Sequence, residues 1–203
     1  MAPGTIAREV EVGGTGIGRL PPGMPPDREN GGPPFREPAG PPAFEAARLG
    51  MLIFLGAETM LFAGFVAAYL VFRLGAPVWP PPFQPRLPVG LTGVNTAVLL
   101  LSGCAMWRGR LGPTVLLGGA FVLLQGYEWT RLLAFGLTAD SGVYGGTFYA
   151  VIGAHAVHAL AGLGWLAALW LRPGTPRRLA VARLYWSFVV GLWPVLYTLV
   201  YLA

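Results

Sequence analysis

The chain has 203 residues, of which 54% are hydrophobic and 11% are charged, and its formal net charge is +5. Soluble domains carry roughly 25% charged residues, so this chain has too few charges to cover a water-facing surface. Its 14 basic residues are all arginines. They stand between apolar runs and do not gather with aromatic residues on one polar face, which argues against a nucleic-acid partner. The composition therefore predicts an integral membrane protein.

The first segment, residues 1–43, differs from the rest in composition. It holds ten of the twenty prolines and nine of the thirty glycines, with single charges between them. It contains no apolar core of the length that a secretory signal needs. Such a segment cannot bury enough apolar surface to offset its chain entropy. We expect residues 1–43 to be a disordered cytoplasmic tail, followed by a membrane domain over residues 44–203.

Five apolar runs make up the membrane domain, each near the roughly 20 residues that cross the hydrocarbon. Helices are required because backbone polar groups inside lipid must be satisfied within the segment. Most connections are short, so we expect consecutive helices to be neighbours in space. The predicted fold is all-α, an antiparallel bundle of five transmembrane helices. The predicted spans are residues 49–74, 88–107, 112–135, 146–171 and 181–202.

The arginines predict the orientation of the bundle. With the N-terminus on the inner side, eleven of the fourteen arginines lie on the inner side of the membrane. Only Arg73, Arg86 and Arg131 lie on its outer side. Cytoplasmic segments of membrane proteins carry an excess of Lys and Arg close to the membrane. The sequence therefore predicts a multi-pass protein of the bacterial inner (cell) membrane. Its N-terminus is expected in the cytoplasm and its C-terminus on the outer side.

Two acids, Glu58 and Glu128, lie inside the predicted spans, and the two histidines of the chain, His155 and His158, both lie in the fourth span. A charge at mid-helix costs at least ~2.5 kcal/mol on insertion scales, so each such residue indicates a function or a specific partner. For Glu58 two interpretations stay open. It is either a proton-accessible or lipid-facing carboxyl, or a neutral side chain hydrogen-bonded to a neighbouring helix.

Glu128 and His155 are expected at similar depth on neighbouring helices. We therefore predict a hydrogen bond from Glu128 to His155 or His158, with Gln125 and Tyr127 nearby. The two histidines are three residues apart, on one face of their helix. Two histidines are too few for zinc, and one helix cannot supply both axial ligands of a haem. We expect this chain to bind no metal or haem by itself and to contain no catalytic residue.

These residues belong to several short sequence motifs, which follow one another along the chain. Residues 50–64 place a glutamate in an apolar helix, residues 79–82 read Trp-Pro-Pro-Pro, and residues 140–149 read Asp-Ser-Gly-Val-Tyr-Gly-Gly-Thr-Phe-Tyr. With these motifs the chain resembles subunit III of the haem-copper oxidases, the family of respiratory cytochrome c and quinol oxidases, over roughly residues 45–203. Further matches are Asn95-Thr96, Gln125 with Glu128, His155 with His158, and Tyr185-Trp186.

The resemblance implies an accessory role in an oxidoreductase complex. Subunit III of this family binds no haem or copper, which reside in the partner subunit. It packs on the haem-bearing catalytic subunit I, in a complex that includes subunit II, and it holds phospholipid and supports proton uptake during oxygen reduction. Arg172, Arg177 and Arg178 at the inner end of the fourth helix are candidates to bind lipid phosphate. Alternatively, these arginines only fix the orientation of the helices in the membrane and bind no particular lipid.

Two departures from the family keep other interpretations open. Relatives usually carry a His and an Asp where this chain has Ser187 and Val190. Longer members have seven helices, so a lipid-filled cleft in this protein would need a wall from another subunit. One alternative is the related accessory subunit of nitric oxide reductases. A different class of alternative is a small membrane transporter or an assembly factor, and a transporter would need a polar file or broken helices.

Overall fold

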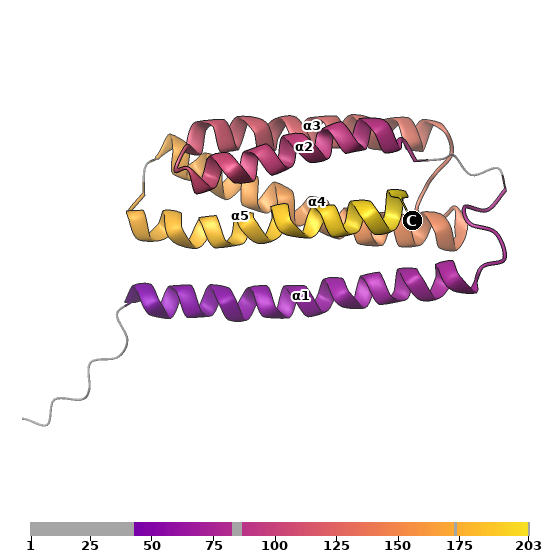
Figure 1. Cartoon of the computed structure of the whole chain (residues 1–203), viewed down its shortest axis with the longest axis horizontal. Coiled ribbons are helices and arrows are strands. Elements are labelled where there is room, and N and C mark those ends of the chain that lie inside the picture. The colour runs from indigo at the N-terminus through magenta and orange to yellow at the C-terminus, as the bar shows by residue number, and fades with distance from the viewer. Residues whose placement is uncertain (1–42, 83–86, 173, 203) are drawn as a thin grey trace, which may run out of the picture. The chain divides into compact units, whose positions relative to one another are not determined.

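A computed structural model describes residues 43–82, 87–172 and 174–202. The predicted disordered tail lies outside these residues, apart from its last position. Every element in the described ranges is helical, which confirms the all-α prediction and its five helices (Figure 1). The elements are α1 (Ala43–Gly75), α2 (Val89–Trp107), α3 (Leu111–Ala134), α4 (Gly142–Leu171), α5 (Pro176–Tyr197) and a terminal π-helical turn, η1 (Thr198–Leu202).

Four stretches of the described chain are long and apolar enough to cross a membrane. They are Glu45–Gly75 in α1, α2, α4, and α5 together with η1. The helix α3 is 24 residues long, but Gln125, Glu128 and Arg131 lower its apolar character. A multi-pass membrane protein is therefore confirmed. Of the five described helices, α3 is the one that is long enough but not apolar enough to be counted as a membrane span by these criteria.

Three helices begin at least four residues earlier than the sequence predicts. The helix α1 begins at Ala43 where residue 49 was expected, α4 begins at Gly142, and α5 begins at Pro176. The prediction followed the apolar runs, whereas a helix continues beyond the hydrocarbon into the headgroup layer. Proline suits the first turn of α5 because the amide hydrogen it lacks would have no partner within the helix there.

The packing order differs from the chain order at one point. The helices α2 and α3 form the most intimate pair, and α5 contacts α1, α2 and α4. In the part of the chain that the structure describes, α1 packs against α4 and α5 and not beside α2 (Figure 1). The prediction that consecutive helices are neighbours is therefore wrong for the first pair. The connection over residues 76–88 is long enough to carry the chain to another part of the bundle.

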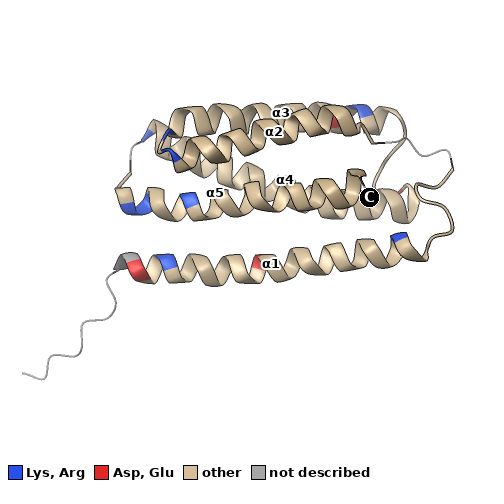
Figure 2. Cartoon of the chain, viewed as in Figure 1, with Lys and Arg blue, Asp and Glu red and all other residues tan. Residues whose placement is uncertain are grey.

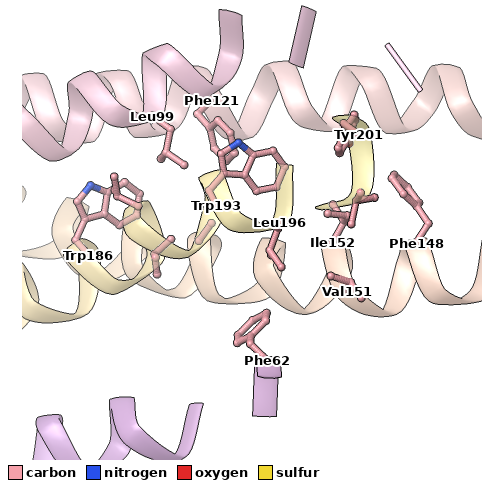
Figure 3. Close-up of a cluster of buried hydrophobic side chains, with 14 of the residues drawn as sticks. Phe62, Leu99, Phe121, Phe148, Val151, Ile152, Trp186, Trp193, Leu196 and Tyr201 are labelled. Atoms are coloured by element: carbon pink, nitrogen blue, oxygen red, sulfur yellow. The ribbon is translucent and has the colours of Figure 1, made fainter. Parts of the chain in front are cut away.

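The centre of the bundle is filled by aromatic side chains of α5 (Figure 3). Trp186 and Trp193 are almost fully buried. Their indole N–H groups donate to α2, from Trp186 to Ser102 Oγ at 3.0 Å and from Trp193 to Thr96 Oγ1 at 2.9 Å. A Cβ added at Gly118 of α3 would lie 2.8 Å from the Trp186 ring, so glycine makes the room for this indole.

Candidate functional site

A pair of ionisable side chains joins α1 to α4 in the middle of the bundle. His158 Nε2 lies 2.9 Å from Glu58 Oε2, and each side chain is 16% exposed. His158 Nδ1 lies 2.7 Å from the carbonyl oxygen of Ala154, one turn earlier in α4. Phe62 packs edge-on against the imidazole with ring centroids 5.2 Å apart. The pair is thus held in position by a hydrogen bond on one side and an aromatic ring on another.

The hydrogen bonds of this pair fix how many protons it holds. A carbonyl oxygen only accepts, so Nδ1 of His158 carries a hydrogen and donates it to Ala154. The contact between Nε2 and Oε2 then needs one further proton, which belongs either to the imidazolium or to the protonated carboxyl of Glu58. Both arrangements have zero net charge. In either arrangement the pair therefore leaves no isolated buried charge.

A second polar cluster joins α3 to α2 and to the C-terminal turn. Glu128 Oε2 accepts hydrogen bonds from Thr92 Oγ1 at 2.8 Å and from Gln125 Nε2 at 3.2 Å. Asn95 Nδ2 donates to Gln125 Oε1 at 3.3 Å, and Gln125 Nε2 also donates to the Tyr201 hydroxyl at 3.3 Å. The polar residues of α3 thus find partners inside the bundle, which lowers the cost of placing them in lipid.

The predicted hydrogen bond from Glu128 to His155 or His158 is wrong. Glu128 is bonded to α2 and to its own helix, while His158 is bonded to α1. Gln125 does lie beside Glu128, but Tyr127 is exposed on the outside of the bundle. The prediction rests on the similar depth of Glu128 and His155 in the membrane. Depth does not fix the rotation of each helix about its axis, so it does not show which side chains face each other.

His155 and His158 turn toward different neighbours although they are three residues apart. His155 is 1% exposed and packs on Trp193 of α5, with ring centroids 4.9 Å apart. Neither of its ring nitrogens has a hydrogen-bond partner among the described residues. Beside it lies an apolar cavity of about 120 Å³ between α3, α4 and α5. Within the described ranges, no group of three or more His, Cys, Asp or Glu is placed to hold a metal ion.

The candidate lipid-binding arginines lie where α4 passes into α5. Arg172 follows the last residue of α4, and Arg177 and Arg178 stand in the first turn of α5. All three are exposed. Figure 2 shows basic residues gathered at this end of the helices and few at the other end. The three side chains are therefore close together along the chain and free to meet a headgroup layer.

Ser187 and Val190, which stand where the resembled family usually has His and Asp, have different surroundings. Val190 contacts α2 at Gly103, where an added Cβ would lie 2.9 Å from Val190 Cγ1. The Ser187 hydroxyl is buried and has no hydrogen-bond partner in the described part of the chain. A carboxylate in place of Val190 would meet the close approach of α2 at Gly103, so the apolar side chain suits this helix contact.

Thr92 and Asn95 are the site residues that the sequence analysis missed as partners. Both are fully buried and bind the polar side chains of α3. A signal was present, because they are polar residues three positions apart in an otherwise apolar span. That spacing puts them on one face of α2, the face that meets α3.

Helices that cross a membrane, with polar clusters buried between them, define a multi-pass membrane protein in which Glu58 and Glu128 are each hydrogen-bonded to another helix. Sequence comparison names the family. The profile described as cytochrome c oxidase subunit III matches residues 41–203, and the chain belongs to this family. The resemblance seen in the motifs is thereby confirmed.

Three relatives show the extent of the similarity. A cytochrome c oxidase subunit 3 of Synechocystis sp. is 35% identical, with 75% of this chain and 74% of the relative covered. The protein of the same name from Bacillus subtilis is 34% identical, with 76% and 84% covered. A probable cytochrome c oxidase subunit 3 from Mycobacterium tuberculosis is 33% identical, with 75% and 86% covered. The similarity thus extends over most of the membrane domain.

Proposed function

We propose that this chain is the non-catalytic subunit III of a respiratory haem-copper terminal oxidase. It packs on the haem-bearing catalytic subunit I, in a complex with subunit II, binds phospholipid, and supports proton uptake during oxygen reduction. The observation that carries the proposal is the family match over residues 41–203. Haem and copper belong to the partner subunits in this proposal, and the chain contributes a membrane scaffold.

The proposal includes α3 as the fifth span of an antiparallel bundle. Only Arg108, Gly109 and Arg110 separate α2 from α3, so the chain turns back directly after α2. The glutamine and glutamate of α3 are hydrogen-bonded within the bundle, which offsets the lower apolar character of this helix. With Arg48 and the turn arginines in the cytoplasm, the N-terminus is cytoplasmic and the C-terminus lies outside the bacterial inner membrane.

The proton-linked role falls first on Glu58 and His158. Their hydrogen bond holds one transferable proton at membrane depth. Glu128 and His155 complete the set of membrane-embedded ionisable groups. Glu128 is held by α2, and His155 lies beside an apolar cavity with no hydrogen-bond partner in the described ranges. A proton that moves between such groups changes hydrogen bonds inside a fixed scaffold and needs no large movement of the backbone.

Lipid binding is assigned to the arginines at the end of α4 and the start of α5. Arg172, Arg177 and Arg178 are exposed at the end of the helices where basic residues gather (Figure 2). Basic residues next to a membrane span attract anionic headgroups of the inner leaflet. Loss of these three charges is expected to weaken the retention of anionic lipid by the purified complex.

The first experiment is affinity purification of the tagged chain from native membranes in mild detergent. Mass spectrometry identifies the partners, and a reduced-minus-oxidised spectrum measures their haem. A large haem-bearing subunit in stoichiometric amount, with oxygen reduction, is the expected result. Nitric oxide reduction by the same complex would move the assignment to the reductase subunit. A colourless chain, in detergent that keeps other respiratory complexes intact, would favour a transporter or assembly factor.

The proton-linked role has its own test in the purified complex. Glu58→Gln removes the carboxyl of the pair, and Glu45→Gln is the matched control, because Glu45 is exposed in the first turn of α1. We expect the Glu58→Gln complex to keep its haem content but to lose turnover several-fold, while the control behaves as wild type. Equal turnover in all three complexes would refute the assignment.

A further inference from the structure

The two carboxyl oxygens of Glu128 have different surroundings. Oε2 lies 2.8 Å from Thr92 Oγ1 of α2 and 3.2 Å from Gln125 Nε2. Oε1 is buried and has no hydrogen-bond partner in the described part of the chain. An ionised carboxylate needs donors at both oxygens to offset the cost of burial. The hydrogen bonds of Oε2 therefore decide which protonation states the carboxyl can adopt.

The Thr92 hydroxyl has one hydrogen and two acceptors within reach. Besides Glu128 Oε2, its Oγ1 lies 2.9 Å from the carbonyl oxygen of Pro88, one turn earlier. A hydroxyl has a single hydrogen to donate and accepts through its lone pairs, so it serves one of these acceptors at a time. The Pro88 carbonyl also accepts the backbone N–H of Thr92 at 3.1 Å, so it keeps a donor in either case. The hydroxyl is therefore free to turn between the two.

Each orientation of this hydroxyl matches one protonation state of Glu128. When the carboxyl is ionised, Thr92 donates to Oε2. When Oε2 carries a proton, the carboxyl donates to Thr92 Oγ1, and the hydroxyl donates to the Pro88 carbonyl. The proton belongs on Oε2, because Oε1 has no acceptor among the described residues. Both states use the same distances of 2.8 and 2.9 Å, so the carboxyl can bind or release a proton without a movement of the helices.

The surroundings of Glu128 act on its charge in opposite senses. Arg131 lies one turn later on α3 and is exposed (Figure 2), and its positive charge favours the ionised carboxyl, whereas burial favours the neutral one. The facing part of α2 carries no ionisable side chain. The other titratable groups that face this part of α3 are Tyr201 of η1 and Tyr149 and His155 of α4. The two opposing effects keep both protonation states within reach.

A small cavity lies between Glu128 and the surface at the end of α3. It has a volume of about 70 Å³, and its walls include Pro88, Glu128, Arg131, Leu132 and Phe135. One water takes about 30 Å³ in the liquid, so the cavity has room for about two waters. Arg131 and Phe135 are both exposed. Water held there would connect the buried carboxyl with the outside of the bundle.

We propose that Glu128 and Thr92 form a proton-binding site that exchanges protons with water through this cavity. A hydronium ion gives one proton to the carboxylate and becomes water, the new O–H bond forms on Oε2, and the Thr92 hydroxyl turns to the carbonyl of Pro88. The charge of the site changes from −1 to zero, and release reverses these steps. The site is separate from the pair of Glu58 and His158. This inference deepens the proton-linked part of the proposed function and rests on it.

The test is infrared difference spectroscopy of the purified full-length chain in lipid nanodiscs, recorded between two pH values. A protonated carboxyl has a C=O stretching band that a carboxylate lacks, and this band shifts when deuterium replaces the proton. We expect a band of this kind to grow on acidification and to be lost in Glu128→Gln. It should remain in the controls Glu45→Gln and Asp140→Asn, which remove exposed carboxyls. A spectrum of Glu128→Gln that equals the wild-type spectrum would overturn the site.

The role of the hydroxyl has a separate measurement. In Thr92→Val the protonated carboxyl loses the acceptor of its O–H group, so its C=O band should move to higher frequency. Thr92→Ser keeps a hydroxyl and should leave the band in place. The matched control is Thr114→Val, because the Thr114 hydroxyl donates to the carbonyl of Arg110. An unmoved band in Thr92→Val, or an equal shift in Thr114→Val, contradicts the proposed site, even where Glu128→Gln does not fold.

The cavity as the route of the proton is tested by the rate of exchange. Leu132 is 3% exposed and lines the cavity, whereas its neighbour Leu133 is 48% exposed. Leu132→Phe should fill the space and slow the deuterium shift of the Glu128 band at least tenfold after transfer to heavy water. Leu133→Phe adds the same ring outside the cavity and should stay within twofold of wild type. Equal rates in the two variants would refute the route.

The proton site and the oxidase assignment fail separately. Haem content and a co-purified catalytic subunit report on the oxidase assignment, while the infrared band belongs to this chain and is recorded with and without partners. A chain that lacks a haem-bearing partner but shows the Glu128 band would refute the oxidase assignment and retain the proton site. A haem-loaded complex in which no band depends on Glu128 would do the reverse.

Discussion

The hydrogen bond between α1 and α4 can be tested by removing each side of it separately and together. Glu58→Met replaces the carboxyl by an apolar group of similar length. His158→Phe keeps a ring against Phe62, which lies 5.2 Å from the imidazole, and removes both nitrogens. The double variant removes the contact without leaving either partner unpaired. The free energy of unfolding of the four proteins then gives the coupling energy between the two side chains.

The expected size of the coupling follows from the geometry. The contact is 2.9 Å long, and each side chain is only 16% exposed. Hydrogen bonds between neutral side chains in membrane proteins average about 0.6 kcal/mol and reach about 1.7 kcal/mol. Hydrogen bonds to charged groups contribute about 1.5–3 kcal/mol. For a pair that holds one proton in either arrangement, we expect a coupling of about 1–2 kcal/mol.

The assay is reversible unfolding of the full chain in bicelles, with unfolding followed by steric trapping. A control cycle combines His158→Phe with Thr114→Val, because Thr114 lies on α3 and its hydroxyl donates to the carbonyl of Arg110. Sites that share no partner should add within about 0.3–0.5 kcal/mol. A coupling no larger than that of the control cycle would refute the contact between α1 and α4.

Three further substitutions test the packing of α5 and the polar cluster of α3. Gly118→Ala should lower the free energy of unfolding by about 1–3 kcal/mol through overpacking, because its Cβ would lie 2.8 Å from Trp186. Its neighbour Gly119 has no atom within 4 Å of such a Cβ, so Gly119→Ala should be neutral or stabilising by up to about 1 kcal/mol. Thr92→Val removes the 2.8 Å donor to Glu128 and should cost about 1–2 kcal/mol. All three changes are measured by the same unfolding assay.

The control for the threonine change is Thr114→Val. The carbonyl of Arg110 that accepts the Thr114 hydroxyl also accepts its backbone N–H at 3.1 Å, so no acceptor is left without a donor. We expect Thr114→Val to lower the free energy of unfolding by less than Thr92→Val does. Equal losses at the two threonines would contradict the role of Thr92 as a partner of α3. A loss at Gly119 as large as that at Gly118 would contradict the close approach of α5.

The helices were predictable because lipid imposes a simple requirement on the sequence. A span needs roughly 20 apolar residues, and such runs are visible in the chain without knowledge of any contact. The apolar runs predicted the first and last residues of the helices less accurately, because helices continue beyond the hydrocarbon into the headgroup layer. The apolar pattern also could not reveal that α1 lies against α4 and α5, because the long connection after α1 permits several neighbours.

The partners of the polar residues were harder to predict than their depth. Each residue turns about 100° around the helix axis, so positions three apart point about 60° away from each other. This angle is enough to direct His155 toward Trp193 and His158 toward Glu58. The apolar faces of these helices are too uniform to show which side meets which neighbour. The polar spacings of Thr92 with Asn95 in α2 and of Gln125 with Glu128 in α3 carried that information.

The central place of α5 has a consequence for how the protein is made. Synthesis runs from the N-terminus, so α5 emerges after α1 to α4, yet its indoles occupy the middle of the bundle beside Ser102, Thr96 and Gly118. Until Trp186 and Trp193 arrive, the earlier helices enclose an unfilled space and hydroxyls without their donors. Insertion of α5 is therefore the step that fills the centre of the bundle. A chain released early would present the cell's membrane proteases with an open bundle instead of a subunit ready for assembly.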